Sequence, residues 1–255
     1  MHQPRKRFGQ NFLVDDSVVA AIIAALHPQR GDLIVEIGPG LGALTGPLLA
    51  LVDELHAVEI DRDLAASLQR RYPRLALHNC DALKFDFARF GRKSRIVGNL
   101  PYNISTPLLF HLESCAASIC DIHVMLQKEV VDRIAATPAD SDYSRLSVML
   151  QYRFAVEKLF DVGPEAFDPR PRVESAVVRL IPRHPLPWPA RDEALFAQVV
   201  GATFAQRRKT LRNSLRAYLA PADFAMLGLD PQGRAQELGV AQFVAIADFV
   251  ATRAG

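Results

Sequence analysis

The sequence predicts an α/β fold in which an open sheet carries helices on both faces, followed by a small all-helical carboxyl-terminal domain. Two observations support this prediction. Short apolar strands alternate with amphipathic helical segments from residue 18 onward, with the clearest strands at 33–37, 55–60, 75–78, 96–97 and 121–126. After a segment with four prolines at 182–189, the pattern is helical throughout.

The remaining elements follow from periodicity and capping signals. An apolar helical stripe over 18–26 predicts a helix capped by Asp16 or Ser17, and Ser105 is a candidate cap for the helix after the fourth strand. Further helices are expected at 128–136, 143–152, 194–205 and 207–219, and a strand pair at 154–162 and 173–181. Because a proline cluster stiffens a linker, we expect domains at 1–182 and 190–255, joined by 183–189. The first domain begins with a basic segment at 1–14.

Composition narrows the class of protein. The 255 residues are 49% hydrophobic, which is enough for a substantial core, and the net charge is only +2. Residues 183–255 contain 9 Lys and Arg against 6 Asp and Glu, whereas the preceding chain contains 21 against 22. The 3 cysteines form no C-x-x-C pair, so neither a disulfide framework nor a metal site is expected. No segment is long enough to span a membrane, and we expect a monomer in the cytoplasm.

The first strand opens into a glycine-rich loop. Gly38 follows residues 33–37 directly and Gly40 comes two residues later, and glycines at this point let the backbone approach a ligand at the start of the next helix. The loop also satisfies the loose fingerprint of dinucleotide-binding proteins. A dehydrogenase therefore stays open on this segment alone.

Acidic side chains at successive strand ends favour S-adenosylmethionine as the ligand. Glu59 ends the second strand, 21 residues after Gly38, where a carboxylate is placed to bind ribose hydroxyls. Asp81 follows the third strand, and Glu36 precedes the first glycine by two residues. This set suits a ligand with a ribose, an adenine amine and a sulfonium better than it suits a pyrophosphate. Asp81 is also a candidate helix cap.

The end of the fourth strand predicts a site for the exocyclic amine of a nucleobase. Asn99 offers a neutral acceptor, and Pro101 restricts Leu100 so that the Leu100 carbonyl points in one direction. Tyr102 supplies a flat face for stacking. Two fixed acceptors stabilise the positive charge that develops on such an amine when it attacks an electrophile. Taken alone, these residues also fit an ordinary turn closed by a packed tyrosine.

Together, V-E-I-G-P-G-L-G (35–42), V-E-I-D (58–61), C-D-A (80–82) and G-N-L-P-Y-N-I-S (98–105) resemble the Rossmann-like, S-adenosylmethionine-dependent N6-adenine methyltransferases. Within these, the chain is similar to the ribosomal RNA small-subunit adenine dimethyltransferases. F-G-Q-N-F-L (8–13), F-x-P-x-P-x-V (167–173) and F-x-x-R-R-K-x-L-x-N-x-L (204–215) extend the resemblance over nearly the whole chain.

The resemblance implies a role for each candidate residue. Gly38, Gly40, Glu59, Asp81 and Asn99 would contact the cofactor, with Asn11 and Leu13 closing over its methionine end. Asn99, Leu100, Pro101 and Tyr102 would form the catalytic turn, and Phe167 would clamp the target adenine opposite Tyr102. Arg170 and Arg172 would lie near phosphates. RNA binding is expected from a basic stripe along the predicted helix 207–219, formed by Arg207, Arg208, Lys209, Arg212 and Arg216.

The implied substrate is a pair of adjacent adenosines in the 3′-terminal hairpin loop of 16S ribosomal RNA, dimethylated at N6 within the immature small subunit during its biogenesis. A large-subunit dimethyltransferase of the macrolide-resistance type is the nearest alternative. A ribosome assembly factor that binds immature small subunits without catalysis is a second. The arginine-rich 204–215 motif and the 8–13 segment favour the small-subunit enzyme.

Overall fold

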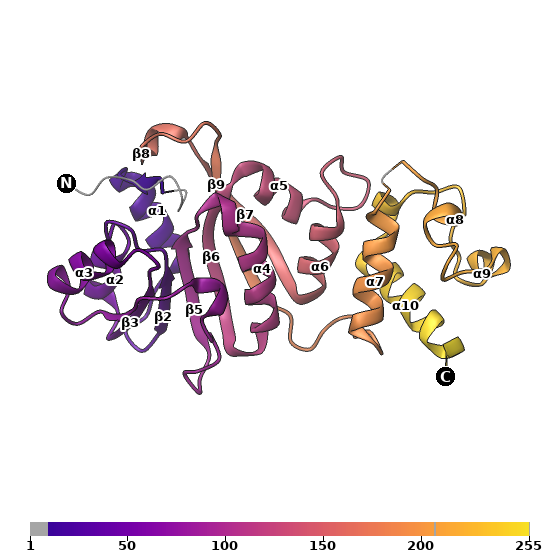
Figure 1. The fold of residues 1–255 in the computed structure, drawn as a ribbon, viewed down its shortest axis with the longest axis horizontal. Helices are drawn as coiled ribbons and strands as arrows, with labels where there is room; N and C mark the ends of the chain where they lie inside the picture. The colour runs from indigo at the N-terminus through magenta and orange to yellow at the C-terminus, as the bar shows by residue number, and fades with distance from the viewer. Residues whose placement is uncertain (1–9, 207, 255) are drawn as a thin grey trace. The chain divides into compact units, whose positions relative to one another are not determined.

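The computed structural model describes residues 10–206 and 208–254. Two compact units are present (Figure 1). One comprises the chain up to Val131 together with Ala155–Pro182, and the other comprises Asp132–Phe154 together with the chain from Arg183 onward. The predicted linker at 183–189 begins where the longer segment of the second unit begins. The sequence-based first domain, 1–182, includes residues 132–154, which the structure assigns to the second unit. This segment packs against helices that are distant in the sequence, so no local pattern could predict the assignment.

A seven-stranded sheet forms the first unit, in the order β4-β3-β2-β5-β6-β9-β7. Each predicted strand is present, with its ends shifted by a few residues at most. The strands are β2 (Leu33–Ile37), β3 (Glu54–Val58), β4 (Ala76–His78), β5 (Ser94–Asn99), β6 (Ile119–Gln127), β7 (Phe154–Val162) and β9 (Ser175–Pro182). The first unit also contains α1 (Asp16–Leu26), α2 (Thr45–Leu51), α3 (Arg62–Arg71) and α4 (Ser105–Ser114), and α5 (Lys128–Ala135) follows β6.

Strand direction brings several chain segments to one edge of the sheet. β2, β3, β4, β5 and β6 are parallel, so their carboxyl ends meet at the same edge. β9 is antiparallel to β6, with Ser175 opposite Gln127, so the amino end of β9 reaches that edge too. Ligands of open α/β sheets bind outside the carboxyl ends of the strands.

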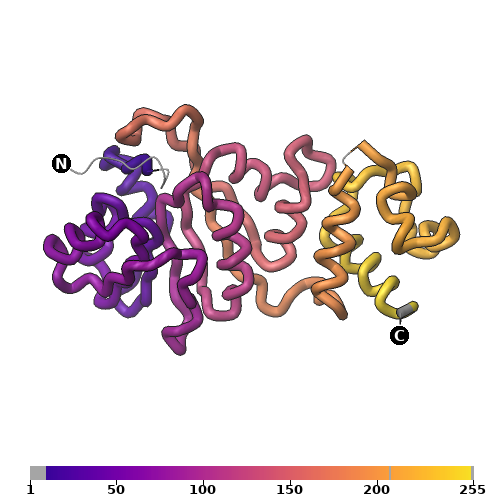
Figure 2. Tube along the Cα trace, in the orientation of Figure 1, coloured from indigo at the N-terminus to yellow at the C-terminus, as the bar shows by residue number. Residues whose placement is uncertain are grey.

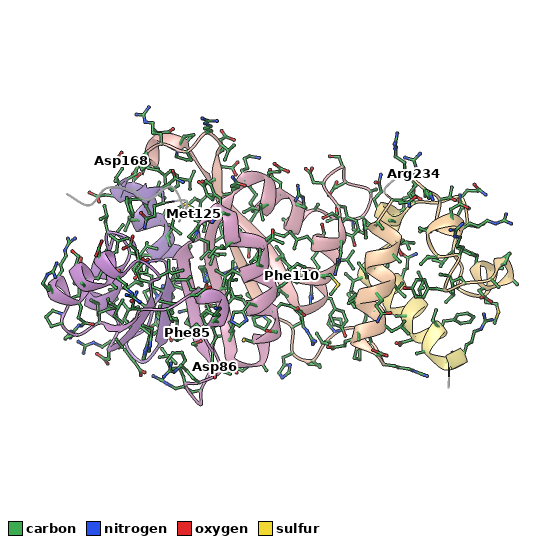
Figure 3. All side chains as sticks on the ribbon, viewed as in Figure 1. Phe85, Asp86, Phe110, Met125, Asp168 and Arg234 are labelled. Atoms are coloured by element: carbon green, nitrogen blue, oxygen red, sulfur yellow. The ribbon has the colours of Figure 1, made fainter. Side chains whose placement is uncertain are left out.

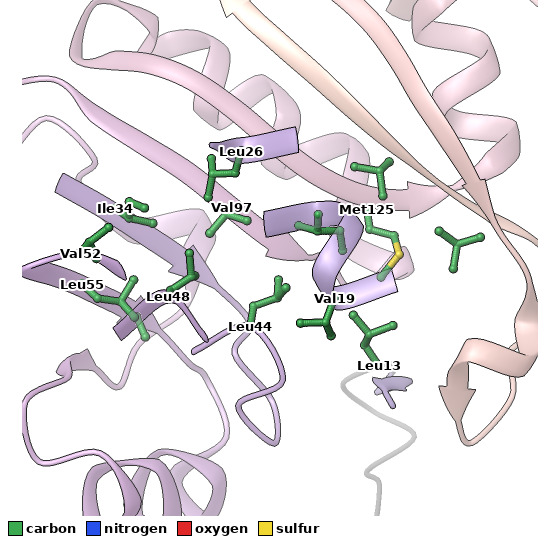
Figure 4. Packing of buried hydrophobic residues seen from close by; sticks show 14 of the residues in the cluster. Leu13, Val19, Leu26, Ile34, Leu44, Leu48, Val52, Leu55, Val97 and Met125 are labelled. Carbon is green, nitrogen blue, oxygen red and sulfur yellow. The ribbon is translucent and has the colours of Figure 1, made fainter. Parts of the chain in front are cut away.

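Helices pack on both faces of the sheet. One face is buried under α1 and α2, whose apolar side chains pack with Ile34, Leu55 and Val97 (Figure 4). Val35 and Ile37, which alternate with Ile34 along β2, are equally buried, and α4 lies in front of the sheet in Figure 1. Strand residues buried on both faces are typical of parallel sheets, and this accounts for the apolar runs in the sequence.

A second sheet of two short strands lies beside this core. β1 (Phe12–Leu13) pairs antiparallel with β8 (Phe167–Asp168), with Phe12 opposite Asp168 and Leu13 opposite Phe167. Both Leu13 and Phe167 are buried in the same hydrophobic cluster as α1 and α2. The sequence did not predict this pairing, because two residues on each side are too few to produce a periodic pattern.

The second unit is helical (Figure 2). It contains α6 (Arg145–Arg153), α7 (Glu193–Phe204), α8 (Leu211–Ser214), α9 (Pro221–Met226) and α10 (Val240–Ala254). Tyr152 of α6 packs against Phe196 of α7 with 4.6 Å between ring centroids, and Phe204 packs against Phe243 of α10. Arg183 donates to the carbonyls of Gln151 and Phe154, which attaches the start of the proline-rich segment to the end of α6.

The prediction of one helix over 207–219 is wrong. α8 spans only Leu211–Ser214, and Thr210 has the extended backbone of a helix cap. The spacing of four residues between Arg208, Arg212 and Arg216 predicted one stripe along a helix. These residues are exposed around this short helix, whereas Leu211, Leu215 and Leu219 are buried.

Two predicted caps are also corrected. Asp15, rather than Asp16 or Ser17, caps α1 and accepts from the backbone N–H groups of Ser17 and Val18. The cap position of α4 is Ile104, and the Ser105 hydroxyl donates to the Pro101 carbonyl. Across the described residues, no helix combines the length and apolarity needed to cross a membrane.

Candidate active site

A cavity of about 300 Å³ opens at the carboxyl edge of β2, β3 and β5. Its lining comes from five segments of the chain. They are residues 10–13, the glycine loop after β2, the ends of β3 and β4, and the turn after β5. Each sequence-predicted cofactor residue lies in this lining, namely Asn11, Leu13, Gly38, Gly40, Glu59, Asp81 and Asn99.

The glycine loop owes its shape to backbone conformations that side chains disfavour. Gly38 and Gly40 have φ values of 68° and 57°, in the left-handed region. A Cβ at Gly40 would lie 3.0 Å from the Phe12 ring, so the loop and the amino-terminal segment approach each other too closely for a side chain. The loop therefore presents backbone to the cavity, as a site for an extended polar ligand requires.

Glu59 is fixed by its neighbours at the end of β3. Its carboxylate accepts from the backbone N–H of Asp61 at 2.8 Å and from that of Gly40 at 3.3 Å, and only 5% of the residue is exposed. Burial raises the pKa of Glu59, and the backbone hydrogen bonds oppose that rise. Each oxygen retains a lone pair for a further donor. This fits a hydroxyl-bearing ligand.

Asp81 contributes a second carboxylate after β4. It accepts from the Leu83 backbone N–H at 3.0 Å and caps a short 3₁₀ turn, η2 (Ala82–Lys84), so the predicted cap is confirmed. The residue also lines the cavity, and its second oxygen remains an acceptor there.

Glu36 is the most buried acid in the cavity wall, with 1% exposed. Burial, reinforced by the nearby Glu59 charge, raises its pKa to about 7 even though the Thr45 hydroxyl donates to it at 2.6 Å. A cation that enters the cavity stabilises the ionised form of such a carboxyl group. The residues thus fit a positively charged ligand such as S-adenosylmethionine.

The amino-terminal segment joins the cavity to the catalytic turn. The backbone carbonyl of Asn11 accepts from Nδ2 of Asn99 at 2.9 Å. Because the nitrogen of this amide is committed to Asn11, Oδ1 is left as an acceptor in the cavity wall. Local sequence gives no signal for this contact, since the acceptor is a main-chain atom 88 residues away.

The turn after β5 holds the remaining predicted catalytic residues. The Leu100 N–H donates to the carbonyl of Met125, which is labelled in Figure 3, and the side chain of Leu100 is buried. Pro101 begins a short 3₁₀ turn, η3 (Tyr102–Ile104), and its carbonyl accepts from Ser105. The Tyr102 ring is half-buried, and its hydroxyl lies 2.6 Å from that of Ser175. Asn99, Leu100, Pro101 and Tyr102 all line the cavity, so the structure brings them together as the sequence predicts.

Phe167 requires a correction. Only 2% of the residue is exposed, and it packs in the cluster that contains Leu13, Val162 and Ala166. A ring this buried has no free face on which a base can stack. The F-x-P-x-P-x-V segment therefore uses its phenylalanine for packing in this structure, while Arg170 and Arg172 are exposed.

Four of the five basic residues predicted to bind RNA are described, and they lie outside the cavity, in the second unit. Arg208, Lys209, Arg212 and Arg216 are all exposed, and Arg207 lies outside the described residues. Only Arg212 belongs to a helix, so the predicted single stripe is replaced by a basic surface around α8.

Comparison with known proteins identifies the family. The family model described as ribosomal RNA adenine dimethylase matches residues 1–252. The chain belongs to this family. A relative from Thiobacillus denitrificans called ribosomal RNA small subunit methyltransferase A is 64% identical and covers 99% of this chain and 100% of its own length. A relative of the same name from Laribacter hongkongensis is 57% identical over 97% of this chain and 96% of its own length.

Two solved structures share the fold. A dimethyladenosine transferase from Plasmodium falciparum has a TM-score of 0.79 at 26% identity, over 92% of this chain and 95% of its own. The 23S rRNA methyltransferase ErmE has a TM-score of 0.75 at 24% identity, over 94% of this chain and 100% of its own. The likeness to ErmE concerns the fold alone, so the solved structure of a large-subunit enzyme does not decide the substrate.

Proposed function

We propose that this chain is an S-adenosylmethionine-dependent dimethyltransferase that modifies N6 of two adjacent adenosines in the 3′-terminal hairpin loop of 16S ribosomal RNA. Membership of the adenine dimethylase family and 64% identity to a small-subunit methyltransferase support this function. The observation that carries the chemistry is the Asn99 amide. Its nitrogen is held by the Asn11 carbonyl at 2.9 Å, which leaves its oxygen as an acceptor in the cavity wall.

Different residues of the cavity wall bind different parts of the cofactor. S-Adenosylmethionine supplies a methyl group on a positively charged sulfur. Gly38 and Gly40 present backbone to it, Glu59 binds its ribose hydroxyls and Asp81 its adenine amine. Asn11 and Leu13 close over its methionine end, and the ionised form of Glu36 adds a negative charge to that wall.

The turn after β5 positions the adenine. Asn99 Oδ1 and the Leu100 carbonyl accept from the N6 amine, and Tyr102 stacks on the base. This arrangement orients the amine for in-line attack and stabilises the positive charge that develops on nitrogen. The proton leaves after the nitrogen has become cationic, so attack requires no general base. The base must first be unstacked from its loop.

The surface around α8 carries the electrostatic part of RNA recognition. Arg208, Lys209, Arg212 and Arg216 are exposed and have no acid among them from residue 204 to 217. Cations in such an arrangement bind phosphates and release counterions. On the sequence alone, Arg207 is expected to bind RNA as well. We place the reaction in the cytoplasm, with a monomer acting on the immature small subunit.

Three alternatives make different predictions. A large-subunit enzyme of the macrolide-resistance type would methylate the other subunit. An assembly factor would bind small subunits and transfer no methyl group. A dehydrogenase would bind a nicotinamide dinucleotide and would have no use for the acceptors of Asn99 and Leu100.

Methyl incorporation from labelled S-adenosylmethionine tests the proposal. Undermethylated small subunits and large subunits are incubated in parallel with the full chain. We expect label in the small-subunit RNA only. Label confined to the large subunit would transfer the assignment to the resistance type, and bound cofactor without label in either subunit would favour the assembly factor.

A further inference from the structure

Tyr102 is attached to the protein at both ends of its side chain. Its backbone lies in η3, whose first turn is closed by the hydrogen bond from the Ile104 N–H to the Pro101 carbonyl. Its hydroxyl lies 2.6 Å from the Ser175 hydroxyl. A tyrosine held only at Cα can rotate about two side-chain torsions. A hydrogen bond at the far end of the ring removes that freedom.

Ser175 is itself rigid. It is fully buried, and it is the first residue of β9, where it pairs with Gln127 at the end of β6. Glu174, the preceding residue, accepts from the Lys128 backbone N–H at 2.9 Å. A short hydrogen bond to a hydroxyl on such a strand gives the ring a fixed reference point.

The topology explains why Ser175 reaches this edge. Asn99 pairs with Met125, and Met125 pairs with Val177, so β5, β6 and β9 form one row behind the catalytic turn. β9 is antiparallel, so its amino-terminal residue Ser175 lies at the carboxyl edge of β5. Strands β5 and β9 thus hold the two polar parts of the site, the Asn99 amide and the Tyr102 hydroxyl.

We propose that Ser175 is a positioning residue that fixes the Tyr102 ring as the stacking surface for the target adenine. The inference rests on the proposed function. Ser175 acts through Tyr102, since its hydroxyl contacts the Tyr102 hydroxyl and it is absent from the residues that line the cavity. With Phe167 buried, Tyr102 is the aromatic residue of the catalytic turn that faces the cavity, so its orientation decides how the base is presented to the sulfonium methyl.

The loss of this hydrogen bond has a specific kinetic consequence. The affinity of the enzyme for small subunits is dominated by phosphate contacts and changes little. Cofactor affinity stays the same, because neither hydroxyl belongs to the residues that we assign to the cofactor. A less ordered base attacks less often, so the rate of the transfer step falls.

A double-mutant cycle tests this with the full chain and undermethylated small subunits. Single-turnover transfer is measured at saturating cofactor and enzyme for wild type, Ser175→Ala, Tyr102→Phe and the double variant. Each single variant is expected to slow transfer about threefold to tenfold, the range for one hydrogen bond. The double variant should be no slower than the slower single variant, because both remove the same interaction.

Ser94→Ala is the matched control. Ser94 is also fully buried and begins β5, and its hydroxyl has no hydrogen-bond partner among the described residues. Its rate should equal that of wild type. Cofactor affinity, measured by calorimetry, should be the same in all variants.

The outcomes separate this inference from the proposed function. A full rate for Ser175→Ala would overturn the role of Ser175 and leave the methyltransferase intact. Ser175→Ala could also slow transfer by the same factor whether Tyr102 or Phe is present at position 102. That result would likewise overturn the role of Ser175, because its effect would not pass through the Tyr102 hydroxyl. If Ser175→Ala does not fold, a full rate for Tyr102→Phe overturns the role, and a slowed rate with unchanged cofactor affinity supports it. Wild type that transfers no methyl group would remove the proposed function and this role together.

Discussion

Hydrogen bonds within the protein fix the polar side chains of this site and leave other atoms of the same groups for a ligand. Asn99 can present its amide oxygen only because Asn11 takes the amide nitrogen. The backbone N–H groups of Gly40 and Asp61 fix Glu59 in the same way. The residue types were predictable from the sequence, since acids, glycines and an asparagine follow successive strands. Their partners were not, because most of these are main-chain atoms or residues from distant segments.

Replacing Asn99 tests the catalytic acceptor. Asn99→Ala should slow methyl transfer about 100-fold or more, because it removes a preorganised acceptor for developing charge. Cofactor affinity should change much less, which calorimetry can measure beside single-turnover rates. Asn99→Asp keeps the acceptor oxygens but loses the donor to the Asn11 carbonyl, so we expect it to be slow as well. A full rate for Asn99→Ala would exclude this residue from the mechanism.

Glu36 predicts a pH dependence of stability. Its pKa rises from 4.5 to about 7 on folding because the side chain is buried. Between these values the folded state binds more protons than the unfolded state, so stability falls as the pH rises toward 7. Glu36→Gln should abolish this loss, which amounts to up to about 3 kcal/mol in the ligand-free protein.

Urea denaturation at pH 5 and pH 8 measures this effect. From pH 5 to pH 8, the unfolding free energy should fall more for wild type than for Glu36→Gln. The variant should therefore gain stability relative to wild type as the pH rises to 8. The same pH slope in both proteins would contradict the raised pKa of Glu36.

The pairing of strands and the packing of helices determine where the site lies. The parallel strands β2, β3 and β5 were predictable, because their apolar runs end in glycine or polar residues. The β1–β8 pair and the group formed by α6 with α7 depend on contacts distant in the sequence and left no local signal. The helix predicted at 207–219 failed for a related reason, since a spacing of four residues between Arg208, Arg212 and Arg216 fits both a long helix and a short helix followed by turns.

Gly98 tests how closely β2 and β5 pack. A Cβ at this position would overlap the Ile37 carbonyl oxygen, which is part of a strand and cannot move aside. We expect Gly98→Ala to lower the unfolding free energy by about 3 kcal/mol or more. Gly31→Ala is the matched control, because nothing lies within 4 Å of its Cβ position. Equal stability of the two variants would contradict the strand packing.

At the scale of the whole molecule, charge is distributed unevenly along the chain. The segment 183–255 contains 9 basic and 6 acidic residues, and the basic residues around α8 are exposed. This excess was readable from the sequence, although its helical stripe was not. A nucleoside site in one unit and a basic surface in the other suit a large, folded RNA substrate.

Salt dependence tests that surface. Arg208 and Lys209 changed together to Ala should weaken binding of small subunits and lower the slope of log affinity against log salt by about 1 to 2, because each phosphate contact contributes roughly 0.7 to 0.9. Filter binding over a salt series measures this slope. Arg62 and Arg70, two exposed arginines of α3, provide the matched double control, whose slope should stay at the wild-type value. An unchanged slope for the Arg208 and Lys209 variant would refute the role of this surface.

We expect the turn after β5 to deliver the N6 amine of adenosine to the cofactor, twice for each of two neighbouring nucleosides. The most direct test is mass spectrometry of nucleosides from the 3′-terminal fragment of small-subunit RNA after complete reaction with the full chain. We predict two adjacent residues of N6,N6-dimethyladenosine. Methyl groups on another base, or on another atom of adenosine, would contradict it.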